Sequence, residues 1–132
     1  MSAVLDTHAA LWYLLDAKKL SPVAAALIDG AAQAGTPAYL SAISLVEVIY
    51  LVERARLPAD AFDRLQTELQ RDRPAFRIVH LDSGVAEAVK QVSRVTVPDM
   101  PDRIIAATAV HLKIPLVTRD QRIQAAGIKT IW

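Results

Sequence analysis

The sequence has no cysteine, only four glycines, and aromatic residues at 5% of its 132 positions. Without cysteine the chain forms neither disulfides nor thiolate metal sites, which fits a reducing compartment. It also has no Gly-x-Gly-x-x-Gly nucleotide-binding loop. No apolar run is long enough to span a membrane, and Asp6 and His8 interrupt the region where a signal peptide needs its apolar core. We therefore expect a soluble cytoplasmic protein.

The charges nearly cancel, because 15 Lys and Arg residues against 14 Asp and Glu residues give a formal net charge of +1. Overall electrostatics therefore do not drive strong binding to a polyanion, and any such site must be local. Hydrophobic residues make up 53% of the chain, mostly aliphatic, as in layered helix-and-sheet proteins. We expect one domain over residues 1–132, with apolar surface to spare for a partner or a dimer.

Short apolar runs alternate with helical patterns along the chain, which predicts an α/β fold around a parallel sheet of four to five strands. The predicted strands are 3–5, 38–40, 77–81, 114–118 and 128–131. The predicted helices begin at Thr7 and near Asp99 and cover 23–34, 41–56, 59–71, 84–93 and 121–126. Asp82 follows a strand but is best explained as the cap of the helix after it.

Four other acids are placed to meet at one edge of such a sheet. Asp6 and Asp120 follow strands, whereas Glu47 and Asp102 lie near the starts of helices. Because the carboxyl ends of parallel strands share an edge, these four side chains should converge there. Converging carboxylates repel one another without a cation, and Mg²⁺ or Mn²⁺ prefers such oxygen ligands. This arrangement is typical of metal-assisted phosphodiester hydrolysis.

Helix capping is the simpler explanation for some of these acids. Asp99 as an N-cap puts Asp102 in the first turn beside the positive end of the helix dipole. Glu47 lies in the second turn if Ser41 is the N-cap, but forms an ordinary capping box if Ser44 is. The residues alone leave both alternatives open.

Four segments together resemble the successive motifs of PIN-domain ribonucleases, and within that family the VapC toxins of bacterial toxin–antitoxin pairs. They are VLDTHAALW at 4–12, Ser41-x-x-Ser44-x-x-Glu47, DRIIAATA at 102–109 and LVTRD at 116–120. The resemblance implies a three-layer α/β/α fold and Mg²⁺-dependent endonuclease action on RNA. It implies that Asp6, Glu47 and Asp102 hold the metal and that Asp120 matches a more variable fourth acid. It also implies a homodimer and an antitoxin partner, with a toxin–antitoxin hetero-oligomer as an alternative assembly.

Several polar residues flank the matched acids. Thr7, Ser41 and Ser44 are expected to hold the carboxylates by hydrogen bonds, alone or together with helix capping. Thr118 is available beside Asp120, and Asp99 is either a cap or an acid just outside the metal's coordination sphere. Arg103 and Arg119 either bind the scissile phosphate or neutralise the acids. Trp12 either stacks on a base or contacts the core or a partner.

Two other functions compete with an endonuclease. A non-cleaving PIN-like module that binds RNA or protein has no need for four converging acids. A phosphatase of the haloacid dehalogenase type needs Asp-x-Asp after the first strand, but here Thr7 and His8 follow Asp6. For the antitoxin we expect a helix bound between the helices 41–56 and 59–71.

Overall fold

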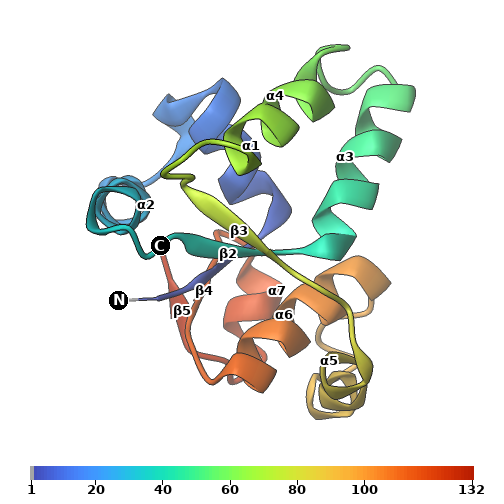
Figure 1. Ribbon diagram of the computed structural model, residues 1–132. Helices are drawn as coiled ribbons and strands as arrows, with labels where there is room; N and C mark the ends of the chain where they lie inside the picture. Colours follow the sequence, from blue (N-terminus) through green and yellow to red (C-terminus); the bar gives the residue numbers. More distant parts are fainter. Residues whose placement is uncertain (1) are drawn as a thin grey trace.

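A five-stranded parallel sheet forms the centre of the computed structural model, which describes residues 2–132 (Figure 1). Its order is β3-β2-β1-β4-β5, and every neighbouring pair is parallel. The strands are β1 (Val4–Leu5), β2 (Ala38–Ser41), β3 (Phe76–Val79), β4 (Leu116–Val117) and β5 (Thr130–Ile131). The predicted parallel sheet is therefore confirmed, with the last strand at an edge.

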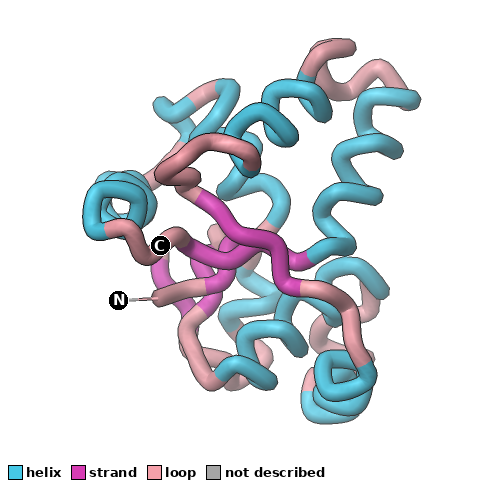
Figure 2. The backbone as a smooth tube through the Cα atoms, viewed as in Figure 1, coloured by secondary structure: helices cyan, strands magenta, loops and turns pink. Residues whose placement is uncertain are grey.

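Helices fill most of the chain between the strands (Figure 2). They are α1 (Thr7–Leu15), α2 (Pro22–Ala34), α3 (Ala42–Glu53), α4 (Ala61–Leu69), α5 (Ser83–Ala88), α6 (Met100–Leu112) and α7 (Gln121–Gln124), with 3-10 turns η1 (Ala17–Lys19) and η2 (Val89–Gln91). The helix α3 ends three residues earlier than predicted, and Ala55 just beyond it adopts a left-handed conformation with φ 57°. No helix within residues 2–132 is both long and apolar enough to cross a membrane.

The sheet separates two apolar cores, because successive residues of a strand point to opposite faces. In β1, Leu5 packs with α1, α2 and α4 on one face, whereas Val4 packs with α5, α6 and α7 on the other. Figure 1 shows these two groups of helices on either side of the strands. The three-layer α/β/α fold is therefore confirmed.

The strand order determines where the acids meet. From β1 the chain continues through β2 to β3 on one side, whereas β4 and β5 lie on the other side of β1. The order thus reverses between β1 and β4, and ligand sites in open α/β sheets lie at such a reversal, beyond the carboxyl ends of the strands. Asp6 follows β1 directly and Asp120 follows β4 after two residues.

Candidate metal centre

Two of the predicted acids are fixed by capping the helices that they precede. The Asp6 Oδ1 accepts a hydrogen bond of 2.7 Å from the backbone N–H of Ala9, at the start of α1. The Asp120 Oδ1 accepts one of 2.8 Å from the backbone N–H of Arg122, at the start of α7. Each bond is made by one carboxylate oxygen, so capping orients these acids and leaves the second oxygen available. Asp82 caps α5 in the same way, as predicted.

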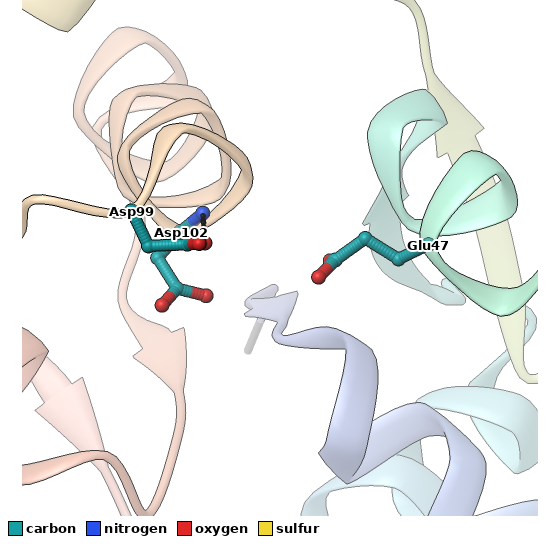
Figure 3. A group of neighbouring side chains, drawn as sticks. All are labelled: Glu47, Asp99 and Asp102. Carbon is teal, nitrogen blue, oxygen red and sulfur yellow. Dashed lines mark hydrogen bonds between the residues drawn. The ribbon is translucent and has the colours of Figure 1, made fainter. Parts of the chain in front are cut away.

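The start of α6 carries two acids with different roles. Asp99 is the N-cap, as predicted, and accepts a 3.1 Å bond from the backbone N–H of Asp102. The Asp102 carboxylate accepts no hydrogen bond within residues 2–132 and faces Glu47 across the gap between α6 and α3 (Figure 3). Capping therefore explains Asp99 but not the position of the Asp102 carboxylate.

Glu47 is held by a short chain of hydroxyl groups. Ser41 is the N-cap of α3, accepting a bond from the backbone N–H of Ile43, so the capping box of Ser44 and Glu47 is wrong. Ser44 is instead fully buried, and its hydroxyl lies 2.7 Å from that of Thr7. Thr7 in turn donates to Glu47 Oε1 at 2.5 Å. Thr7 thus orients Glu47 directly and Ser44 does so through Thr7, whereas Ser41 makes no hydrogen bond with these acids within residues 2–132.

The four predicted acids line one open pocket of about 250 Å³. Its walls are Asp6, Thr7, His8, Trp12, Glu47, Asp102, Arg119 and Asp120. Glu47 and Asp102 also form a tighter group with Asp99, in which one carboxylate oxygen from each residue lies within 4.8 Å of the others. The structure therefore brings together every acid that the sequence singled out for this edge, and it also groups Asp99, which does not line this pocket, with Glu47 and Asp102.

Burial and mutual repulsion disfavour the charged form of these acids. Burial, followed by the charges of Asp99 and Glu47, raises the pKa of Asp102 to about 7. Burial also raises the pKa of Asp6 and of Glu47, although hydrogen bonds from Thr118 and Thr7 respectively oppose the rise. A set of oxygen donors that repel one another fits a hard divalent cation, because the cation would bind the carboxylates and cancel the repulsion.

The two arginines beside the acids point in different directions. The Arg103 guanidinium donates to the carbonyl oxygens of Val89 at 3.0 Å and Val92 at 2.9 Å, so it anchors α6 to the η2 segment. Arg103 does not line the pocket. Neither of the two roles expected for it, binding the phosphate or neutralising the acids, therefore fits its position. Arg119 does line the pocket.

Sequence reasoning missed one wall residue of the pocket, His8, and left the role of another, Trp12, open. His8 and Trp12 both line it, and their rings lie 5.7 Å apart between centroids. The available signal was their spacing of four residues on the helix that begins at the cap Asp6, which puts both on one face of α1. Thr118, the other polar neighbour of interest, is fully buried and accepts a 3.0 Å bond from the backbone N–H of Asp120.

The three-layer α/β/α fold places four carboxylates beyond the ends of its parallel strands, where open α/β sheets bind ligands. Residues 3–129 match the model of the PIN domain, and the chain belongs to this family. It is 28% identical over 124 residues to Ribonuclease VapC22 of Mycobacterium tuberculosis (strain ATCC 25618 / H37Rv), covering 94% of this chain and 91% of that protein. The predicted resemblance to VapC-type PIN domains is confirmed.

Chains of several solved structures match this fold over almost their whole length. VapBC2 from Rickettsia felis, bound to a promoter DNA fragment, superposes with a TM-score of 0.74 at 16% identity, covering 99% of this chain and 98% of that one. FitAcB from Neisseria gonorrhoeae gives a TM-score of 0.67 at 26% identity, with coverage of 100% and 97%. A toxin–antitoxin complex from Klebsiella pneumoniae gives 0.65 at 23% identity, with coverage of 98% and 96%.

Proposed function

We propose that this protein is a divalent-metal-dependent RNA endonuclease that acts as the toxin of a toxin–antitoxin pair. The convergence of Asp6, Glu47, Asp102 and Asp120 on one pocket carries the proposal. The similarity to a protein named as a VapC ribonuclease supports RNA as the substrate class. The proposal places the protein in the cytoplasm, where its substrate and its antitoxin are made.

In this proposal Asp6, Glu47 and Asp102 hold Mg²⁺ or Mn²⁺, with Asp120 as a fourth acid beside them. A cation bound there would supply an activated water and would stabilise the charge that develops on the phosphate and the leaving oxygen. The chain supplies preorganisation. Capping bonds fix Asp6 and Asp120, and the hydroxyl of Thr7 fixes Glu47, so the carboxylates need little rearrangement on binding.

A non-cleaving PIN-like module is the alternative. It would have to maintain carboxylates that burial and repulsion destabilise, with no reaction to benefit from them. A binding surface for RNA is better served by cations than by a cluster of acids. These costs favour the nuclease over the binding module.

The direct test is cleavage of a panel of end-labelled structured RNAs in EDTA, in Mg²⁺ and in Mn²⁺, with the new ends mapped. We expect internal cuts in both metals and none in EDTA, because the proposed mechanism takes its activated water from the bound cation. Cleavage that persists in EDTA would contradict the metal-dependent mechanism. Tight RNA binding without cleavage under all three conditions would instead support the binding module.

We also propose that the chain self-associates and binds an antitoxin. Exposed apolar side chains of α3 and α6, Val46, Tyr50 and Met100, line an open groove. The groove lies on the α6 side of α3. On the α4 side, where we expected the antitoxin helix, Val52 and Phe62 pack against the core. The antitoxin site that we expected between α3 and α4 stays a prediction.

Light scattering tests self-association. We expect twice the monomer mass for the parent chain and a shift toward monomer for Tyr50→Ser, which removes an apolar side chain 55% exposed on the groove. Val95→Ser is the matched control, because Val95 is 91% exposed but does not line the groove. A strictly monomeric parent at high concentration would rule the dimer out.

Co-expression with the product of a neighbouring short reading frame should suppress toxicity, and a lack of rescue would count against an antitoxin.

A further inference from the structure

Arg119 lies against an aromatic ring on the wall of the acidic pocket. Its Cζ atom is 4.6 Å from the centroid of the Trp12 ring, and both residues line the pocket together with the four acids. Arg119 follows the buried Thr118 and precedes the capping Asp120, so its backbone is fixed on both sides. A guanidinium stacked on an indole is a favourable cation–π arrangement.

The Arg119 guanidinium pairs with no acid in residues 2–132. None of the ion pairs of this part of the chain, which extend to 4.0 Å, involves it, and no hydrogen bond there engages its N–H groups. Direct neutralisation of the acids, one of the two roles considered from the sequence, is therefore not what this side chain does. Its donors are left available for a ligand with two oxygens in one plane, which is how a phosphate group meets arginine.

Trp12 is itself fixed by aromatic neighbours from two ends of the chain. Its ring lies 5.7 Å from His8 at 51° and 5.8 Å from Trp132 at 63°, between centroids. Trp12 also packs against the core cluster that contains Leu5. A ring held in this way limits the positions that a stacked guanidinium adopts. Because Arg119 covers this ring, base stacking on Trp12 would have to displace it.

The lining of the pocket therefore combines two kinds of charged group. Four carboxylates line it, those of Asp6, Glu47, Asp102 and Asp120, together with the guanidinium of Arg119, which lies over the Trp12 ring. This combination suits a phosphodiester, because a guanidinium binds phosphate oxygens and a divalent cation held by the acids would bind others. Within residues 2–132, Arg119 is the only lysine or arginine that lines this pocket.

We propose that Arg119 binds a phosphate group of the RNA beside the carboxylates, and that Trp12 positions the guanidinium for that contact. This inference rests on the proposed function, because it takes RNA as the substrate. Arg119 is then a substrate-binding residue, whereas Trp12 is a positioning residue. The conservative change Arg119→Lys keeps the charge but loses the planar stacking surface, so it should restore the contact only in part.

Steady-state cleavage of an RNA that the panel assay shows to be cut separates the two roles. We expect Arg119→Gln to raise KM about 10-fold or more with little change in kcat, since a charge-assisted phosphate contact is lost. Trp12→Leu should raise KM about 2- to 5-fold with Arg119 still present, and Trp12→Phe should recover most of that loss because the ring is kept. Arg122→Gln is the matched control, as Arg122 is exposed and outside the pocket.

Binding without cleavage gives an independent measurement. Fluorescence anisotropy of a labelled mixed-sequence single-stranded RNA, in EDTA and at several salt concentrations, reports the number of phosphates contacted. For Arg119→Gln we expect the slope of log affinity against log salt to fall in magnitude by about 0.7, one phosphate contact, and for Arg122→Gln to leave it unchanged.

The outcomes separate this inference from the proposed function. A parent protein that binds RNA with a slope that Arg119→Gln does not change, or an unchanged KM in that variant, overturns the role of Arg119 alone. Unchanged KM in Trp12→Leu, at an unchanged melting temperature, overturns the positioning role. A parent that binds RNA through Arg119 but cuts none would support the phosphate contact and contradict the nuclease.

Discussion

Replacing Asp102 with asparagine is expected to lower the rate of RNA cleavage roughly a thousandfold or more while the protein stays folded. The Asp102 carboxylate faces Glu47 and accepts no hydrogen bond within residues 2–132, so the change removes a charge without breaking a contact. Asparagine keeps the shape of the side chain, but a neutral amide is a much weaker ligand for a divalent cation. The cleavage assay with Mg²⁺ and Mn²⁺ measures the loss.

The same variant should be more stable than the parent when metal is absent. Because the pKa of Asp102 is raised to about 7 in the folded protein, its contribution to stability is present at pH values below its ordinary pKa of 3.8 and is lost as the pH rises to about 7. Asp102→Asn removes that loss. In EDTA we expect the melting temperature of the variant to exceed that of the parent by about 3 °C at pH 8. After solvent screening is allowed for, the gain in the free energy of unfolding is on the order of 1 kcal/mol. The gap should narrow toward pH 4.

Asp82→Asn is the matched control for this experiment. Asp82 also precedes a helix, where it accepts a 2.9 Å bond from the backbone N–H of Val85, but it lies outside the pocket. Asparagine caps helices about as well as aspartate, so both activity and stability should be unchanged. If Asp102→Asn behaved like Asp82→Asn, the acids at the start of α6 would be structural only.

Removing the hydroxyl of Thr7 should reduce metal affinity or cleavage by about 10- to 100-fold. Thr7→Val keeps the side-chain shape at a buried position but deletes the hydrogen bond to Glu47. It also deletes the hydrogen bond between Thr7 and the buried Ser44 hydroxyl. The bond to Glu47 lowers the pKa of Glu47, so its loss raises the pKa further and lets protons compete better with the metal. The defect in metal affinity should therefore be larger at pH 6 than at pH 8.

Thr7→Ser tests whether the hydroxyl carries this effect. It keeps the donor to Glu47 and loses one buried methyl group, so its activity should stay within a few-fold of the parent while its stability falls by about 1 kcal/mol. Calorimetric titration with Mn²⁺ at the two pH values gives the affinities. Equal affinity in Thr7→Val and the parent would show that Glu47 needs no such support.

Much of the site could be predicted because each acid is tied to a local pattern. Asp6 and Asp120 follow apolar strands, and a parallel sheet necessarily brings such positions to one edge. Pro101 in the first turn of α6 and Asp99 before it likewise identify the start of that helix without any knowledge of its neighbours.

What could not be predicted depends on contacts between distant segments. Ser41 rather than Ser44 caps α3. The Ser44 hydroxyl is hydrogen-bonded instead to the hydroxyl of Thr7, which lies 37 residues away in the sequence. The direction of Arg103 is decided by carbonyl groups of the η2 segment. The support of Trp12 by Trp132 joins opposite ends of the chain and leaves no local signal.

The central claim is that Asp6, Glu47 and Asp102 act as a single site for a divalent cation. The most direct measurement is the melting temperature of the parent and of Asp6→Asn, Glu47→Gln and Asp102→Asn, each with and without Mn²⁺. We expect Mn²⁺ to stabilise the parent and each substitution to remove most of that stabilisation, because binding to the folded state is weakened. A parent that Mn²⁺ does not stabilise, or variants that keep the full shift, would contradict the claim.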